Sequence, residues 1–304
     1  MIGSIRRALA QTRVQVRTRL FAQLAATSLR LASRLTGNVV IGIDYPPSAA
    51  NVPRYGYGKP PHQRLWDLFE RDAARHHETL RAIAGFASEL RRIELYAKDP
   101  LEPSWINHWL PALDSAAIYG FMRLRAPRLF LEIGSGNSTF FADRARRDGA
   151  LESQIISIDP QPRADVDRVC DRVIRAPLEA VDLALFGELR AGDILYFDGS
   201  HRVFMNSDVA VFFLDVLPAL PAGVLVAIHD IYLPDDYSPA IADRYYSEQY
   251  MLAAYLLGGA KVSIVLPAAH VSRGNAAHVL DELWSYPELA GVERHGDLFW
   301  FETR

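Results

Sequence analysis

Residues 129–141, which read LFLEIGSGNSTFF, constrain the fold of this chain more strongly than any other segment. An apolar run ends at Glu132, a turn with two glycines follows at residues 134–136, and Asn137 and Ser138 can begin a helix. A strand that passes through a glycine turn into a helix is the unit with which α/β sheets cradle nucleotides. The glycines permit positive φ angles and a close approach of the backbone to a ligand.

The turn does not suit a dinucleotide. A dinucleotide fingerprint has a third glycine where this chain has Thr139, and the acidic Glu132 would repel a pyrophosphate. A carboxylate at this position suits a ligand that carries a cationic or amino group instead. A nicotinamide-dependent oxidoreductase is therefore disfavoured.

Strand and helix patterns alternate from residue 128 to the C-terminus. Short apolar runs predict strands at residues 128–132, 154–158, 172–175, 193–197, 223–228, 261–266 and 297–302. Helical patterns lie at residues 137–148, 162–170, 178–189, 203–219 and 244–257, and residues 267–296 predict a loop with a short helix at 276–286. This alternation predicts an α/β fold with a mostly parallel sheet that helices cover on both faces.

Two further segments precede this alternating region. Residues 1–43 hold seven arginines and no acidic residue, and their apolar spacing predicts a basic helical arm. Residues 44–127 combine a proline-rich and aromatic stretch with helical patterns at residues 64–96 and 115–124. We therefore expect three parts: the arm, a linker with a helical extension, and a domain over residues 128–304.

Composition limits the partners and the compartment. The net charge is −3, so no overall basic field favours nucleic acid. The single cysteine, Cys170, excludes an internal disulfide and fits a reducing, cytoplasmic setting. No apolar run is long enough to predict a transmembrane helix. Two interpretations of residues 1–36 stay open: a helix that contacts an anionic membrane surface or targets the chain, and a solvated, self-packing helix.

Polar side chains follow the predicted parallel strands. Glu132 ends the first strand and Asp159 follows the second. Asp198 follows the fourth strand, and His229 and Asp230 follow the fifth. Because the carboxyl ends of parallel strands meet at one edge of a sheet, we expect these residues to form one ligand site there. An acid after the second strand is placed to accept the hydroxyls of a ribose.

Residues 128–235 resemble the class I S-adenosylmethionine-dependent methyltransferases. The likeness rests on four motifs: LEIGSGNS at residues 131–138, SID at 157–159, DGSH at 198–201 and IHDI at 228–231. The resemblance implies a Rossmann-like sheet of seven strands in the order 3-2-1-4-5-7-6. It places residues 297–302 as a reversed strand between strands five and six.

The resemblance also implies how these positions bind S-adenosylmethionine. Gly134 and Gly136, with Ser135, Asn137 and Ser138 of the same turn, would pass under its methionine part. Glu132 would lie near its amino group, Asp159 would hold the ribose hydroxyls, Pro177 and Leu178 would flank the adenine, and Asp198 would face the reacting centre.

Two interpretations of the catalytic residues remain open. Some of the relatives bind a divalent ion at three acids, and the matching positions here are Asp198, His229 and Asp230. An imidazole in place of one carboxylate favours manganese, iron or zinc over magnesium. Without a metal, His201 or His229 would act as a general base near neutral pH, with Asp198 beside the reacting centre.

We expect an O-methyltransferase that acts on a small-molecule or glycosidic hydroxyl. Aromatic residues at 55–57 and 105–109 would either cover the acceptor or pack the helical extension on the sheet. The alternative is a protein that binds S-adenosylmethionine without methylating anything, as a membrane-tethered partner of other proteins. The sequence names no acceptor.

Overall fold

The computed structural model describes residues 26–35, 40–41, 52–162, 164–273 and 280–304. The chain divides into two compact units, residues 1–50 and 51–304. Within the first unit residues 26–35 are helical, and the rest of the arm predicted over residues 1–36 lies outside the described residues. No helix in the described part of the chain is long and apolar enough to cross a membrane.

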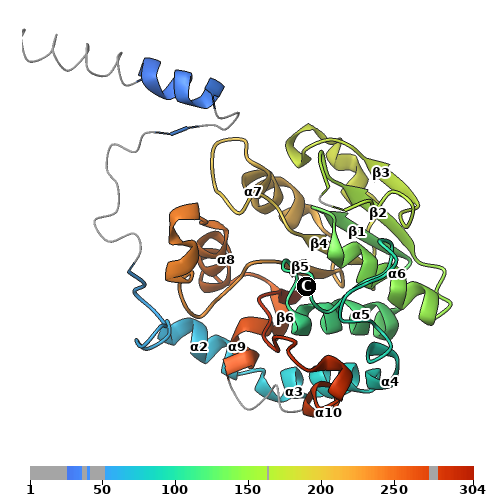
Figure 1. Ribbon diagram of the computed structural model, residues 1–304. Helices are drawn as coiled ribbons and strands as arrows, with labels where there is room; N and C mark the ends of the chain where they lie inside the picture. The colour runs from blue at the N-terminus through green and yellow to red at the C-terminus, as the bar shows by residue number, and fades with distance from the viewer. Residues whose placement is uncertain (1–25, 36–39, 42–51, 163, 274–279) are drawn as a thin grey trace, which may run out of the picture. The chain divides into compact units, whose positions relative to one another are not determined.

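The second unit is built on a sheet of seven strands (Figure 1). The strands are β1 (Leu129–Ile133), β2 (Gln154–Ile158), β3 (Arg172–Ile174), β4 (Ile194–Phe197), β5 (Leu225–Ile228), β6 (Val262–Pro267) and β7 (Phe299–Thr303). Their order is β3-β2-β1-β4-β5-β7-β6, and β7 runs antiparallel to both of its neighbours. The predicted strands and the strand order implied by the resemblance are confirmed.

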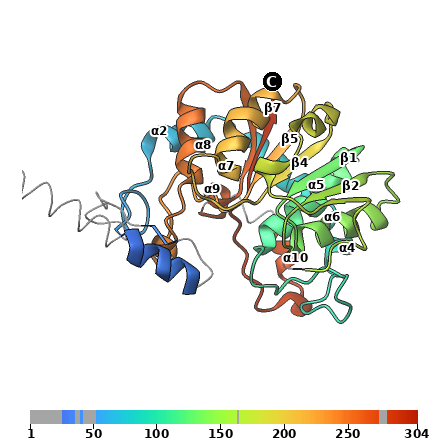
Figure 2. The same ribbon diagram turned by 90° about the horizontal axis from the view of Figure 1, so that it is seen from above.

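Helices cover both faces of the sheet, because the strand residues alternate between two apolar cores. In β1, Leu129 and Leu131 face one core and Phe130 faces the other. The first core contains residues of α2 (Gln63–Glu70), α7 (Asp208–Val211) and α8 (Glu248–Leu257). The second contains residues of α3 (Ala73–Ala84), α5 (Ala112–Arg125) and α6 (Asn137–Asp148). Figures 1 and 2 show α7 and α8 on one side of the strands and α5 and α6 on the other.

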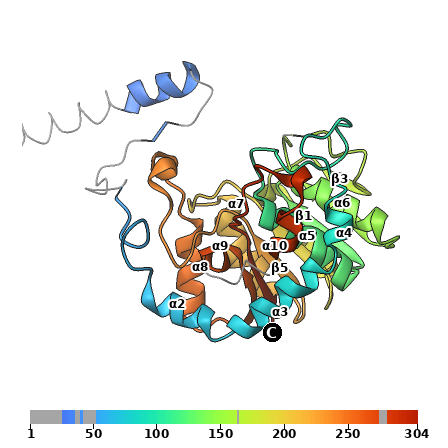
Figure 3. The same ribbon diagram turned by 60° about the horizontal axis from the view of Figure 1, so that its bottom comes forward.

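The single helix predicted over residues 64–96 is wrong. The structure has three helices there: α2, α3 and α4 (Ala87–Leu90). They follow one another around the edge of the sheet (Figure 3), from α8 on one face, past β6, to α10 (Asp281–Trp284) on the other. A straight helix of this length would span about 50 Å and could not follow that path. The bends let these helices shield the edge strand β6.

The helix predicted at residues 162–170 is also wrong. Apart from residue 163, which lies outside the described residues, this segment forms bends and a turn. Pro160 and Pro162 restrict the backbone before it, and the turn suffices to bury Val166 and Val169 against Phe140.

Three further helices differ from their predicted ranges. Residues 178–189 form two 3-10 helices, η1 (Leu178–Ala180) and η2 (Leu183–Glu188), because Val181 between them is extended. The helix predicted at 203–219 begins only at α7, where the Ser207 hydroxyl accepts the Ala210 N–H. It continues as a π-helix, η3 (Phe212–Val216), and a 3-10 turn, η4 (Leu217–Ala219).

Helix α8 begins at Glu248, after Tyr245 takes a left-handed φ of 52°. Three short helices complete the unit: η5 (Pro239–Arg244), α9 (Ala268–Arg273) and η7 (Pro287–Leu289). Of the helix predicted at 276–286, α10 is observed, and residues 274–279 lie outside the described residues.

The packing of α3 on α5 depends on Gly120. A Cβ atom at this position would lie 2.7 Å from Cγ1 of Ile83, which is fully buried. We expect Gly120→Ala to lower the free energy of unfolding by about 1 kcal/mol, because overpacking outweighs the gain in helix propensity. Urea unfolding measures this change.

Gly187 is the matched control, since a Cβ atom there has no neighbour within 4 Å. Gly187→Ala should leave the unfolding midpoint nearly unchanged. Equal stability of the two variants would contradict the tight contact between α3 and α5.

Candidate functional site

The glycine turn lies directly against the end of β4. Gly134 has a φ of 79°, and a Cβ atom there would overlap the carbonyl oxygen of Asp198. The Asp198 N–H donates to the Ile133 carbonyl at 2.8 Å, which continues the pairing of β1 with β4. Only glycine fits this backbone conformation and this contact without strain. The turn and Asp198 therefore form one surface.

Glu132 lies behind the turn and is fully buried. The hydroxyls of Ser138 and Thr139, in the first turn of α6, donate to its two carboxyl oxygens. Burial raises the pKa of Glu132 to about 8, although these two hydrogen bonds oppose the shift. Glu132 is not among the residues that line the cavities beside the turn.

Asp159 connects the glycine turn to the end of β2. Its Oδ2 accepts the Ser135 N–H at 2.8 Å, and its Oδ1 accepts the Gln161 N–H at 2.7 Å. The Ser135 hydroxyl also lies 2.6 Å from the Ser157 hydroxyl. Asp159 lines a cavity of about 430 Å³ together with Gly134, Pro177 and Leu178.

Two more cavities continue from this one along the same edge of the sheet. The second, of about 310 Å³, shares Ser135 and Asp198 with the first and is also lined by Gly136, Asn137, Ser138, Tyr196 and His229. The third, of about 500 Å³, shares Asn107, Trp109 and Leu110 with the second. Asp230, Tyr232, Arg244, His295 and Asp297 lie on its wall. We call these the first, second and third cavities.

The aromatic segments contribute unequally to these walls. Trp109 lines the second and third cavities and is 55% exposed. Trp105 is buried and packs against Phe141 and Trp284, although it also borders the third cavity. Tyr55 lines none of the three; its N–H donates to the Asp236 carboxylate at 3.0 Å.

His201 lies among three carboxylates. Its Nδ1 is 2.9 Å from Glu248 Oε2, and its Nε2 is 3.2 Å from Asp198 Oδ1 and 3.3 Å from Asp230 Oδ2. Burial opposes the charge, but the carboxylates of Asp198 and Glu248 outweigh it and hold the pKa of His201 well above its usual range. Left-handed φ angles of 61° at His201 and 55° at Asp230 place these side chains at the sheet edge.

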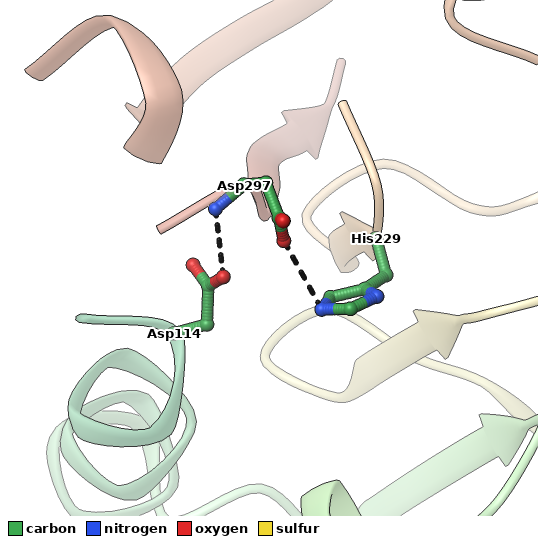
Figure 4. A group of neighbouring side chains, drawn as sticks. All are labelled: Asp114, His229 and Asp297. Atoms are coloured by element: carbon green, nitrogen blue, oxygen red, sulfur yellow. Dashed lines mark hydrogen bonds and ion pairs between the residues drawn. The ribbon is translucent and has the colours of Figure 1, made fainter. Parts of the chain in front are cut away.

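His229 lies near Asp297 and Asp114 (Figure 4) and also faces Asp198. Its Nε2 is 3.1 Å from Asp297 Oδ1, and its Nδ1 is 3.7 Å from Asp198 Oδ1. Asp114, in the first turn of α5, accepts the N–H groups of Asp297 and Leu298 at 2.7 and 3.0 Å. Burial opposes the charge on His229, but the Asp297 and Asp198 carboxylates outweigh it and raise its pKa.

Sequence reasoning missed Asp114, Asp297 and Glu248. Asp297 lies two residues before β7, and Glu248 is the first residue of α8. Asp114 is an acid within an otherwise apolar stretch of helix, which is the one local signal that could have marked it. All three residues come to the site through the packing of α5, α8 and β7.

The residues predicted to hold a metal do not gather around one point. Metal ligand atoms lie about 2.0–2.2 Å from a transition metal, so two of them are at most about 4.4 Å apart. In the described part of the chain only Asp114, His229 and Asp297 bring three ligand atoms within 4.8 Å of one another. The set Asp198, His229 and Asp230 does not, and both Asp114 oxygens already accept backbone N–H groups.

The buried Glu132 predicts a pH-dependent stability. Its folded pKa of about 8 is above the unfolded value of 4.5, so the folded protein binds more protons between these values. Its contribution to the free energy of unfolding therefore falls as pH rises from about 4.5 to 8. We expect Glu132→Gln, which cannot ionise, to gain stability relative to the parent chain over this range. Thermal unfolding at several pH values measures it, and a constant difference would contradict the assignment.

Comparison with known proteins agrees with this architecture. Residues 131–231 match the family model of a methyltransferase domain, and no curated protein matches the chain. The O-methyltransferase TomG from Streptomyces achromogenes, solved with S-adenosylmethionine, is 18% identical over 51% of this chain and 72% of its own, with a TM-score of 0.35. An O-methyltransferase from Bacillus cereus, solved with S-adenosylhomocysteine, is 14% identical over 75% and 91%, with a TM-score of 0.39.

A methyltransferase from Podospora anserina, solved with S-adenosylhomocysteine, is 16% identical over 69% of this chain and 93% of its own, with a TM-score of 0.38. Similarity at this level assigns neither a substrate nor a metal to this chain. The family match runs from β1 to the end of β5 and includes the glycine turn and the polar strand ends. This chain therefore contains a methyltransferase domain, and its sheet has the strand order that the sequence resemblance implied.

Proposed function

We propose that this chain transfers the methyl group of S-adenosylmethionine to a hydroxyl group of a small polar molecule. The observation that carries the proposal is the continuous row of three cavities, with Asp198 and His229 on the wall of the middle one. A donor in the first two cavities and an acceptor in the third would meet at these two side chains. Most of the catalysis would come from this positioning.

The first two cavities fit the donor. S-adenosylmethionine supplies a methyl group on a positively charged sulfur. Asp159, Pro177 and Leu178 would hold the ribose and adenine in the first cavity, and the turn at Gly134–Gly136 would hold the methionine part in the second. Burial opposes ionisation of Asp198, but the nearby His229 and His201 charges outweigh it and keep its pKa below the usual range. A permanent negative charge at this boundary favours a cationic donor.

The third cavity fits a polar acceptor with a ring. Trp109 offers an exposed aromatic surface for stacking, and Asn107, Arg244 and His295 offer hydrogen-bond donors. A cavity with this mixture suits a glycosidic or phenolic hydroxyl better than an unbranched apolar chain. On this proposal residues 105–111 form part of the acceptor wall.

His229 is the proposed base. Its ring lines the second cavity, and its Nε2 forms an ion pair with Asp297 at 3.1 Å. As the acceptor oxygen forms its bond to the methyl carbon and the carbon–sulfur bond breaks, the hydroxyl proton would pass to His229. His201 is a poorer base, because carboxylate oxygens lie within 3.3 Å of both of its nitrogens, whereas His229 Nδ1 is 3.7 Å from Asp198.

A proton count on donor binding tests the role of His229. In the free protein the Asp297 and Asp198 carboxylates raise the pKa of His229 against the effect of burial, which favours the protonated ring. A cation beside Asp198 would lower that pKa, so His229 would release protons when S-adenosylmethionine binds. S-adenosylhomocysteine lacks the positive sulfur and should cause a smaller release. Calorimetry in buffers of different ionisation enthalpy measures both counts.

His229→Gln should abolish the difference between the two ligands, whereas His77→Gln on α3 should retain it. Equal proton counts for both ligands in the parent chain would remove His229 from the role of base.

Methyl transfer itself is tested with radiolabelled S-adenosylmethionine and a panel of glycosides and phenols. We expect label in at least one acceptor, and a reduction of kcat by about 100-fold or more in His229→Gln. Binding of the donor without transfer to any acceptor would favour the alternative, a binding protein without catalytic activity.

A further inference from the structure

His201 is in contact with acids at both nitrogens of its ring. Carboxylate oxygens accept hydrogen bonds and cannot donate them. Because Nδ1 faces Glu248 and Nε2 faces Asp198 and Asp230, a ring with a proton on each nitrogen can donate to acids on both sides. Glu248 is fully buried, and its Oε1 has no hydrogen-bond partner within the described residues.

The same ring separates the two strand-end acids. Asp198 follows β4 and Asp230 follows β5, the neighbouring parallel strand, so their carboxylates repel each other across the sheet edge. His201 Nε2 lies between them at 3.2 and 3.3 Å. The two acids are partly exposed, with side-chain exposures of 26% and 19%, and a ring of the same chain lies between them.

A metal bound by these three residues would require a different spacing. In that arrangement Glu248 would orient His201 from behind, as carboxylates do behind metal-bound histidines. The ligand atoms of Asp198, His201 and Asp230 would then lie within about 4.4 Å of one another. They do not form such a group, although all three residues are described. The ring bridges the two acids without sharing a ligand sphere with them.

We propose that the His201 ring occupies the position between Asp198 and Asp230 that a divalent cation would take, so that methyl transfer by this protein does not require a metal. His201 is on this view a positioning residue: it fixes the two carboxylates, and Glu248 fixes its ring. The proposal rests on the proposed function for its catalytic consequence but makes a separate claim about metal binding.

The charge balance agrees with this assignment. Asp198, Asp230 and Glu248 contribute up to three negative charges, and His201 neutralises one, whereas a divalent ion would neutralise two. Burial raises the pKa of Glu248 to about 7, which reduces its share of the charge near neutral pH. The remaining negative charge beside the second cavity suits the positive sulfur of the donor.

The first experiment is manganese binding to the chelator-treated full chain, followed by calorimetry and electron paramagnetic resonance. The parent chain should bind no Mn²⁺ at this site, and its affinity for S-adenosylmethionine should be the same with and without a chelator. His201→Ala should bind Mn²⁺ at least about tenfold more tightly than the parent chain, because two unpaired carboxylates remain. His77→Ala is the control and should behave as the parent chain.

Uptake of one equivalent of Mn²⁺ by the parent chain that Asp230→Asn loses would overturn the proposal, because the ion would lie between the strand-end acids. Uptake that Asp297→Asn loses and Asp230→Asn keeps would place the ion at Asp114, His229 and Asp297 and would support the assignment of His201. A folded His201→Ala chain that binds no Mn²⁺ would also overturn it. The measurement on the parent chain decides the matter even where the variant does not fold.

The same samples separate this inference from the proposed function. Failure to bind S-adenosylmethionine would contradict the proposed function and would leave the Mn²⁺-binding result valid. If binding of S-adenosylmethionine and methyl transfer depend on added Mn²⁺, the inference about His201 is contradicted and the proposed methyltransferase activity is not.

Discussion

One imidazole ring held among three carboxylates connects the parts of this structure that form the site. His201 contacts Asp198 at the end of β4, Asp230 at the end of β5 and Glu248 at the start of α8. Burying several charges is tolerable only when each has a partner of opposite sign. The contacts therefore fix the loop after β4 and the first turn of α8 relative to the strands. The second and third cavities depend on that arrangement.

The reversed strand β7 supplies the other half of the site. Because β7 runs antiparallel to β5, its first residues lie at the edge where the parallel strands end. Asp297 is thus carried to His229 although 67 residues lie between them in the sequence. Asp114 receives the N–H groups of Asp297 and Leu298, so the start of α5 holds the entry to β7. Two elements distant in sequence meet here through backbone hydrogen bonds to one buried carboxylate.

Local patterns predicted the strands well because each strand is short, apolar and bounded by polar or glycine residues. They failed for the helices where the path of the chain mattered. The apolar stripe over residues 64–96 serves two cores, with Leu65 and Phe69 on one face of the sheet and Leu80 and Ile83 on the other. Helical periodicity shows which residues share one side of a helix, but it does not show which face of the sheet that side covers. Ends of helices such as α8 were likewise set by left-handed residues that have no strong sequence signal.

By itself the sequence determined the kind of protein and the edge of the sheet at which the polar strand ends meet. A glycine turn and acids after successive strands are local features, and parallel strands bring their ends to one edge whatever the helices do. The tertiary structure alone decided what surrounds the two histidines. The spacing of the DGSH and IHDI motifs was compatible with a group of metal ligands and also with a histidine that acts as a catalytic base. Glu248, Asp297 and Asp114 reach the site only through packing of α8, β7 and α5. Electrostatics at short range depends on distance in space, which the order of residues does not contain.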